Sequence, residues 1–187
     1  QMARKSENIL VACMPKSGST YLSTIIASLS GMRRGAIVPA YKRREQELCE
    51  KCLELELNTT FQLRRIYRRR EGGVQHRSHG FVAQHHVRCS EYTQSLLNDY
   101  GIKTIVLVRN LFDIVVSLRD HLVDNAIFMP MAYFTEDMKK WDPQKVYRFL
   151  ADMAIPWYVN FFVSWAQSEN VRFLSYEQLV DKPAETV

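Results

Sequence analysis

The sequence of 187 residues has no apolar run long enough to cross a membrane and no internal repeat or low-complexity tract. It also shows no signal peptide and no lipidation motif, and Met2-Ala3-Arg4-Lys5 is typical of a native start. These absences argue against a membrane-spanning or secreted protein. We therefore expect one domain over residues 1–187, a cytoplasmic location and no membrane partner.

Cysteine is also scarce, with four residues in the chain. Cys49 and Cys52 form a C-x-x-C pair, but a zinc site needs a second pair at suitable spacing, and Cys89 with a distant histidine does not supply it. The pair lies in a Glu-rich helical pattern without the strand-then-helix setting of redox motifs. We expect reduced thiols and no metal.

The remaining composition suits a globular protein that binds an anion. Hydrophobic residues make up 47% of the chain, which is enough for a core, and the net charge is +5. Much of the excess charge lies in residues 42–44 and 64–70. A solvated basic helix face explains such clusters more often than nucleic-acid binding does, so we expect no nucleic-acid partner.

Hydrophobic patterning predicts alternating strands and helices. Strands are expected near residues 8–13, 80–85, 103–108 and 171–175, and helices near 19–30, 45–57, 58–70, 90–99, 110–123 and 144–167. This order indicates an α/β protein with an open parallel sheet covered by helices on both faces, a three-layer arrangement like that of P-loop proteins. Asp124–Trp141 is the least regular stretch, and it could be an acceptor-binding lid or an ordinary surface crossover.

The most informative segment is Met14-Pro15-Lys16-Ser17-Gly18-Ser19-Thr20-Tyr21, between the first predicted strand and helix. A helix start offers unpaired N–H groups and partial positive charge. Lys16 adds a full charge, and Gly18 allows close approach of the backbone. Hydroxyl donors are offered by Ser17, Ser19 and Thr20. The segment therefore predicts an anion site; the alternative is a basic, Ser-rich turn before a helix.

The order of residues distinguishes this turn from a nucleoside-triphosphate loop. In G-x-x-x-x-G-K-[ST] the lysine follows the last glycine, whereas Lys16 precedes Gly18 and the first glycine is missing. The order P-K-S-G-[ST]-T plus an aromatic resembles the sulfotransferases, with Tyr21 where a Trp is common. In that family the loop holds the 5′-phosphosulfate of 3′-phosphoadenosine 5′-phosphosulfate (PAPS). A P-loop nucleotide kinase or NTPase is kept as an alternative.

A second segment, Lys103 to Val108, is a β-branched apolar run that predicts a buried parallel strand ending in Arg109. Open α/β sheets bind ligands at this end of their strands. The residues Arg109, Asn110, Asp113 and Ser117 match the family pattern R-N-x-x-D-x-x-x-S. The resemblance implies that Arg109 and Ser117 bind the 3′-phosphate of the cofactor. The alternative is an arginine that ends a strand and a serine that merely lies on a helix.

A third segment, from Gly80, predicts a short strand that ends in His85 and His86. A neutral imidazole is suited to remove the proton of an attacking hydroxyl at pH 7. Neighbouring strand residues point to opposite faces, so only one of the two can face the cleft. The resemblance places the catalytic base on His86, and a slip of one residue would place it on His85. Two structural histidines are the alternative.

A fourth segment near the end of the chain, Asn170 to Leu179, resembles the family pattern V-x-F-L-x-Y-E-x-L. The resemblance implies that Tyr176 lies beside the adenine ring. Taken alone, a tyrosine after a strand is more often part of the core.

Taken together, the resemblance implies a sulfotransferase that moves a sulfuryl group from PAPS to a hydroxyl or amine, releases 3′-phosphoadenosine 5′-phosphate (PAP), and needs no metal. His86 would act as base, and Lys16 would stabilise the leaving group. The acceptor would be a small molecule or a carbohydrate. The family's C-terminal Arg-Lys-Gly segment is not found in these 187 residues, so that part of the family domain is expected to be absent. A non-catalytic PAP-binding homologue is therefore a further alternative.

Overall fold

The computed structural model describes residues 7–39, 47–68, 80–124, 128–129 and 132–182, and for residues 64–68 and 128–129 it describes the backbone alone. The basic residues 42–44 lie outside the described residues, and so do the side chains of the cluster at 64–70.

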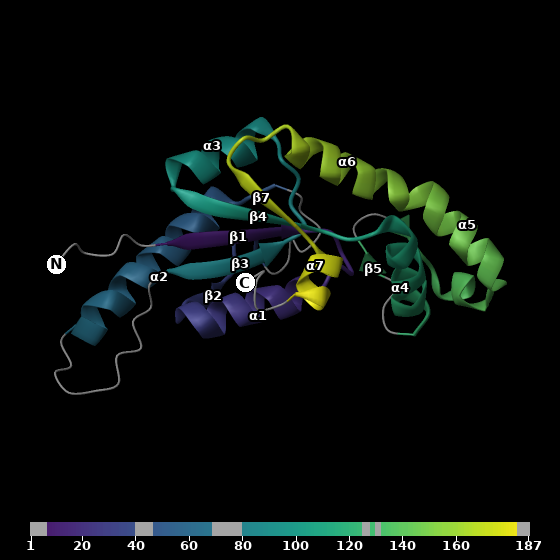
Figure 1. Ribbon diagram of the computed structural model, residues 1–187, viewed down its shortest axis with the longest axis horizontal. Coiled ribbons are helices and arrows are strands. Elements are labelled where there is room, and N and C mark those ends of the chain that lie inside the picture. The colour runs from purple at the N-terminus through teal and green to yellow at the C-terminus, as the bar shows by residue number, and fades with distance from the viewer. Residues whose placement is uncertain (1–6, 40–46, 69–79, 125–127, 130–131, 183–187) are drawn as a thin grey trace.

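The centre of the protein is a five-stranded sheet with the strand order β2-β3-β1-β4-β7 (Figure 1). All neighbouring strands in it are parallel. The carboxyl ends of the strands therefore meet at one edge, which we call the carboxyl edge, and their starts meet at the amino edge. The strands are β1 (Asn8–Cys13), β2 (Arg33–Gly35), β3 (Phe81–His85), β4 (Ile102–Val108) and β7 (Val171–Ser175).

Helices cover both faces of this sheet. Alternate residues of β1 point to opposite faces, so Leu10 and Ala12 join one hydrophobic cluster while Val11 and Cys13 join the other. One cluster includes α1 (Ser19–Ser30) and α7 (Tyr176–Asp181). The other includes α2 (Glu50–Arg68), α3 (Glu91–Asp99), α4 (Leu111–Asp124), α5 (Pro143–Met153) and α6 (Ile155–Ala166). In Figure 1, α1 lies below the sheet, and α3 and α6 lie above it. The predicted α/β fold is confirmed.

The predicted single helix over 144–167 is two helices, α5 and α6, separated at Ala154. Pro156 is the physical reason, because proline has no N–H to donate and its ring clashes with the carbonyl one turn earlier. The chain continues with a tighter turn, in which the Trp157 N–H donates to the Ala154 carbonyl over 3.0 Å.

The two helical segments predicted at 45–57 and 58–70 instead form one helix, α2. Cys49 lies directly before the first residue of α2, and its carbonyl accepts the Leu53 N–H at 3.0 Å. The C-x-x-C pair thus lies at the start of the helix, and the described residues directly before it, 47–49, form no strand. Burial, followed by the hydrogen bond with Cys49, raises the pKa of the Cys52 thiol. All four cysteines are free thiols.

The stretch expected to be irregular, residues 124–141, contains short elements. An antiparallel pair, β5 (Phe128–Met129) and β6 (Ala132–Tyr133), is followed by the 3-10 helix η2 (Glu136–Lys140). Phe134 and Ala132 are buried in the core. The stretch therefore packs against the body of the protein, and its predicted alternatives of lid or crossover remain predictions.

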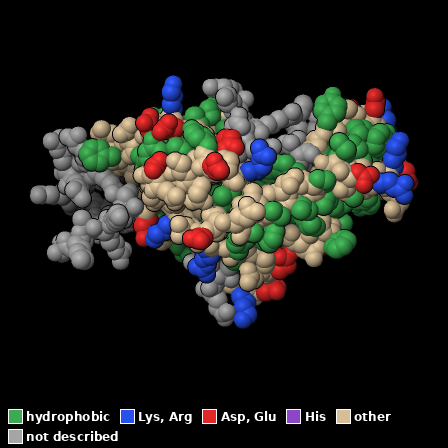
Figure 2. All heavy atoms as spheres, turned by 90° about the horizontal axis from the view of Figure 1, so that it is seen from above, with side chains coloured by type: hydrophobic (Ala, Val, Ile, Leu, Met, Phe, Trp, Pro, Cys, Tyr) green, Lys and Arg blue, Asp and Glu red, His purple; other side chains and the backbone are tan. Residues whose placement is uncertain are grey.

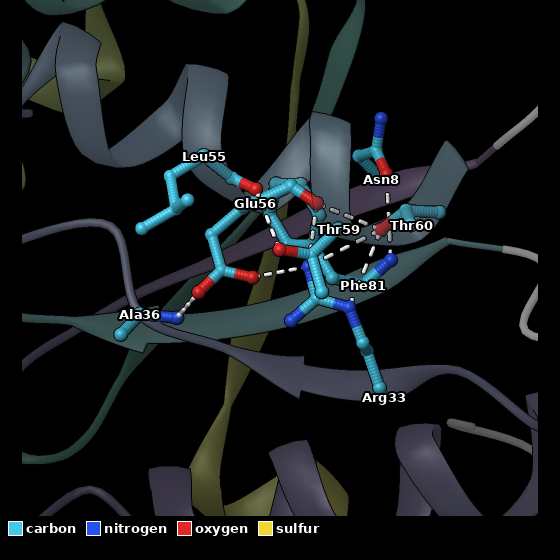
Figure 3. Close-up of polar contacts among 8 residues, drawn as sticks. All are labelled: Asn8, Arg33, Ala36, Leu55, Glu56, Thr59, Thr60 and Phe81. Carbon is cyan, nitrogen blue, oxygen red and sulfur yellow. Dashed lines mark hydrogen bonds and ion pairs between the residues drawn. The ribbon is translucent and has the colours of Figure 1, made fainter. Parts of the chain in front are cut away.

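At the amino edge, Arg33 of β2 holds α2 against the sheet (Figure 3). Its guanidinium forms an ion pair with Glu56 and donates to the Thr60 hydroxyl at 3.2 Å. The other Glu56 oxygen accepts the Ala36 N–H at 2.8 Å. Nearby, the buried Asn8 side chain accepts the Phe81 N–H at 3.3 Å. These contacts thus hold α2 against β2 and connect β1 with β3 at this edge.

The outer face of α6 is apolar. Val159, Phe162 and Val163 are exposed, and the Phe162 ring lies 5.5 Å from that of Phe173 on β7. Figure 2 shows the hydrophobic side chains that gather on this upper side of the molecule. None of the helices formed by the described residues combines the length and the apolar character that crossing a membrane requires.

Candidate functional site

The turn between β1 and α1 has an unusual backbone. Lys16 adopts a positive φ of 65°, which non-glycine residues rarely do, and Gly18 has a φ of 81°. A Cβ on Gly18 would lie 2.8 Å from the Tyr176 ring, so both the dihedral and the space require glycine there. The buried Ser17 hydroxyl donates to the Met14 carbonyl at 2.5 Å and closes the turn.

Arg109 contacts both this turn and Tyr176, the residue that follows the edge strand β7. Its Nη1 donates to the Lys16 carbonyl at 2.9 Å, and its Cζ lies 4.3 Å from the centroid of the Tyr176 ring. Arg109 follows β4, which pairs with β1, and Tyr176 follows β7, which pairs with β4, so both residues lie at the carboxyl edge. Among the described residues, the buried Nε of Arg109 has no hydrogen-bond partner. The turn, the arginine and the tyrosine thus form one cluster.

Glu177 connects α7 to the segment after Arg109. Its Oε1 accepts the Asn110 N–H at 3.0 Å. Burial favours the protonated carboxyl, but the hydrogen bonds from backbone N–H groups and the nearby Arg109 charge outweigh it and lower the pKa of Glu177. Glu177 belongs to the pattern V-x-F-L-x-Y-E-x-L and Asn110 to R-N-x-x-D-x-x-x-S, but neither pattern predicted that the two residues form a hydrogen bond.

His86 lies just past the end of β3, with its Nδ1 2.8 Å from the Cys13 carbonyl. A carbonyl only accepts hydrogen bonds, so Nδ1 carries the proton and Nε2 keeps its lone pair. Burial lowers the pKa of His86, although the hydrogen bond with Cys13 opposes this effect. A neutral imidazole with an unprotonated Nε2 is the form that a general base requires.

The neighbouring His85 is the last residue of β3. Its ring stacks on that of His86 with 6.3 Å between centroids. Its carbonyl accepts a hydrogen bond from the Cys13 thiol at 3.5 Å. Burial raises the pKa of that thiol to about 12, so Cys13 stays protonated beside both histidines.

Two further candidates lie on α4. Ser117 is half-buried, and His121, one turn later on the same side of the helix, was not singled out from the sequence. Burial, followed by the charge of Lys16, lowers the pKa of His121. This side of α4 is therefore within electrostatic reach of the turn.

The remaining predicted site residues lie in the first turn of α1. The Ser19 hydroxyl accepts a hydrogen bond from the Gln84 side chain at 2.8 Å and is buried. Thr20 and Tyr21 are exposed, with Tyr21 55% accessible. Gln84 was also missed by sequence reasoning, since a single glutamine in a strand carries no signal. Among the described residues, no group of three or more His, Cys, Asp or Glu could hold a metal ion.

A comparison with protein-family models shows the family of the chain. Residues 6–187 match the model described as the sulfotransferase domain. The chain belongs to the sulfotransferase domain family. No curated protein sequence matches this sulfotransferase domain.

Solved structures show the same fold. One is the mouse sulfotransferase SULT7A1 complexed with PAP, at a TM-score of 0.59 and 19% sequence identity. Another is retinol dehydratase in complex with androsterone and the inactive cofactor PAP, at a TM-score of 0.50 and 15% identity. Each match covers 97% of this chain but only 55% and 57% of the respective protein. The sulfotransferase domain described here therefore spans just over half the length of these proteins.

Proposed function

We propose that this sulfotransferase domain transfers a sulfuryl group from PAPS to a hydroxyl or amine, and that its acceptor is a small molecule or a carbohydrate. The observation that carries the proposal is the cluster at the carboxyl edge, where the Lys16 turn, Arg109 and Tyr176 are in contact. Beside it, His86 presents an unprotonated Nε2. Retinol dehydratase with androsterone supports a small-molecule acceptor.

The donor groups of this cluster fit a ligand with phosphate at both ends. Lys16 and the N–H groups at the start of α1 suit the 5′-phosphosulfate. Arg109, whose buried Nε has no partner among the described residues, would bind the 3′-phosphate together with Ser117. Tyr176 would contact the adenine ring. Contributions from Ser17 to Tyr21 are also proposed, with Ser17 acting through its backbone because its hydroxyl closes the turn.

In this proposal His86 Nε2 removes the proton from the acceptor oxygen as that oxygen forms its bond to sulfur. The bond between sulfur and the bridging oxygen breaks, and PAP leaves with that oxygen. Lys16 stabilises the negative charge that develops there, an electrostatic contribution made by a group already in place. The proposal involves no metal. His85 is the alternative base, but the hydrogen bond that sets the tautomer of His86 favours His86.

The decisive experiment combines binding and transfer. Calorimetry should show that PAP binds more tightly than ADP or ATP, and labelled PAPS should then transfer its label in a screen of hydroxyl and amine acceptors. Lys16→Ala and His86→Ala should each lower turnover about 10²-fold or more without unfolding the protein. Binding of PAP without any transfer would indicate a non-catalytic homologue. Magnesium-dependent ATP hydrolysis would instead indicate the NTPase alternative.

Two broader predictions accompany this proposal. We infer that residues 1–187 behave as one domain, which the family match over residues 6–187 supports. The cytoplasmic location expected from the sequence stays a prediction. The contribution of a C-terminal Arg-Lys-Gly segment to PAP affinity can be measured by comparing this chain with a longer family member.

A further inference from the structure

One side of α6 is completely buried against the centre of the molecule. Tyr158, Phe161 and Trp165 lie three and seven residues apart, which places them on one face of the helix, and each has 0% accessible surface. Two of these three side chains carry a polar group. Buried polar groups normally have a hydrogen-bond partner, so the partners of Tyr158 and Trp165 show which segments α6 contacts.

Trp165 is bound to the segment that follows the proposed base. Its Nε1 donates to the Val87 carbonyl at 3.0 Å, one residue after His86. The neighbouring Ser164 hydroxyl accepts the Cys89 N–H at 3.3 Å. Residues 86–90 lie between β3 and α3 without regular secondary structure, so their backbone groups need partners from elsewhere. Helix α6 supplies two of them.

Tyr158 lies at the other half of the site. Its hydroxyl points to the Pro15 carbonyl at 3.4 Å, a longer contact, one residue before Lys16. Burial, with a smaller effect of the nearby Cys13, raises the pKa of Tyr158, so the phenol keeps its proton and acts as a donor. The same face of one helix therefore contacts the backbone beside Lys16 and the backbone beside His86.

We propose that α6 positions the two reacting groups relative to each other, with Trp165 a positioning residue for His86 and Tyr158 one for Lys16. This inference rests on the proposed roles of those two residues. The Cys13 carbonyl accepts a hydrogen bond from the His86 ring, and Trp165 donates to the carbonyl of the next residue, Val87. Because misplacement of a catalytic group by about 1 Å can cost about 10²-fold in rate, a brace of this kind controls turnover without touching substrate.

The test uses three variants of the same helix face. Trp165→Phe and Tyr158→Phe each remove one donor, and Phe161→Leu is the matched packing control because Phe161 forms no hydrogen bond to the site. For each protein, melting temperature, PAP affinity by calorimetry, and the tautomer and titration of His86 by nitrogen-15 NMR are measured. Turnover at saturating PAPS is then compared.

The expected results separate the two contacts. Trp165→Phe should shift the His86 titration and lower turnover about tenfold, with PAP affinity unchanged. Tyr158→Phe, which loses the longer contact, should weaken PAP binding about threefold and leave the His86 titration unchanged. Phe161→Leu should lower the melting temperature alone.

The inference is overturned if Trp165→Phe behaves like the packing control, losing stability while the His86 titration and turnover per folded molecule stay at the wild-type values. Failure of the proposed function looks different, because the wild-type protein itself would then not bind PAP. The His86 tautomer in Trp165→Phe would still decide whether α6 holds the histidine.

Discussion

The two edges of the sheet carry similar residues in different surroundings. At the amino edge the Cζ of Arg33 lies 5.7 Å from the centroid of the Phe81 ring. At the carboxyl edge the Cζ of Arg109 lies 4.3 Å from the centroid of the Tyr176 ring. Arg33 is neutralised by Glu56 and hydrogen-bonded to Thr60. Arg109 donates to a backbone carbonyl, which carries no net charge. An arginine paired with a carboxylate stabilises the fold, whereas one held by carbonyl and ring keeps positive charge for a ligand.

The same contrast holds for the lysines. At the amino edge Lys103 forms an exposed ion pair with Glu7 at 2.8 Å. At the carboxyl edge Lys16 lies on a turn with a positive φ, in contact with Arg109 through its carbonyl. Strain of this kind is found at functional sites, where surrounding contacts hold it in place. The amino edge is thus predicted to determine stability, and the carboxyl edge binding and turnover.

The largest expected effect comes from Lys16→Ala. Turnover should fall about 10²-fold or more, because the charge that stabilises the leaving group is lost, while the melting temperature changes little. Lys103→Ala is the matched control at the amino edge and should leave turnover unchanged. Steady-state transfer from labelled PAPS measures both. Equal losses in the two variants would contradict the contrast between the edges.

Arg109→Ala should weaken PAP binding by about 10- to 100-fold, since a hydrogen bond to a charged group contributes about 1.5–3 kcal/mol. Calorimetry measures this loss. The effect should shrink at high salt, because much of it is electrostatic. Unchanged affinity would remove Arg109 from the proposed 3′-phosphate site.

Arg33→Ala should have the opposite profile. The free energy of unfolding should fall by about 1–3 kcal/mol, because the partly buried Glu56 carboxylate loses its partner. PAP affinity of the folded protein should stay at the wild-type value. Denaturant unfolding and calorimetry provide the two numbers, and a loss of PAP affinity in the folded variant is the contrary result.

The pH dependence of turnover should reflect His86. Its base form is neutral, so activity falls when pH drops through its pKa, and burial has lowered that pKa below its ordinary 6.5. The acidic limb of the rate profile should therefore lie below pH 6.5. His86→Ala should abolish this limb in the residual activity. A limb above pH 6.5 would argue against His86 as the base in its observed surroundings.

The smallest effect is expected for Glu177→Gln. A lowered pKa in the folded state stabilises the protein above the ordinary value of 4.5, and this contribution is lost as pH falls through the lowered pKa. The wild-type melting temperature should therefore decline more than that of Glu177→Gln below pH 4.5. Parallel declines would show that the Asn110 contact does not depend on the carboxylate charge.

Much of the fold could be predicted from local patterns. The strands at 8–13 and 103–108 and the turn at Lys16 follow from apolar runs that end in polar or glycine-containing segments. The break at Ala154 was also signalled by Pro156, but the strong apolar pattern around it favoured one helix. The short strand β2 was missed because three residues, Arg33–Gly35, carry too little pattern.

The site was predictable only as separate pieces. Lys16, Arg109 and Tyr176 each come after the end of a predicted strand, so their presence at one edge could be expected, but their contacts could not. Two further features depend on side-chain packing. The Ser17 hydroxyl closes the turn by its hydrogen bond to Met14, and the missing side chain of Gly18 leaves space for the Tyr176 ring. The proposal of His86 rather than His85 as the base rests on the hydrogen bond between the His86 ring and the Cys13 carbonyl.

The sequence by itself determined the family, the alternation of strands and helices, and which residue types stand at the strand ends, because these depend on order along the chain. Only the tertiary structure decided the strand order β2-β3-β1-β4-β7, the sharing of one α6 face between the backbones beside Lys16 and His86, and the tautomer of His86. The reason is that these features depend on contacts between residues far apart in the chain. Such contacts form because buried polar groups need hydrogen-bond partners, and a local sequence pattern does not predict which distant residue supplies the partner.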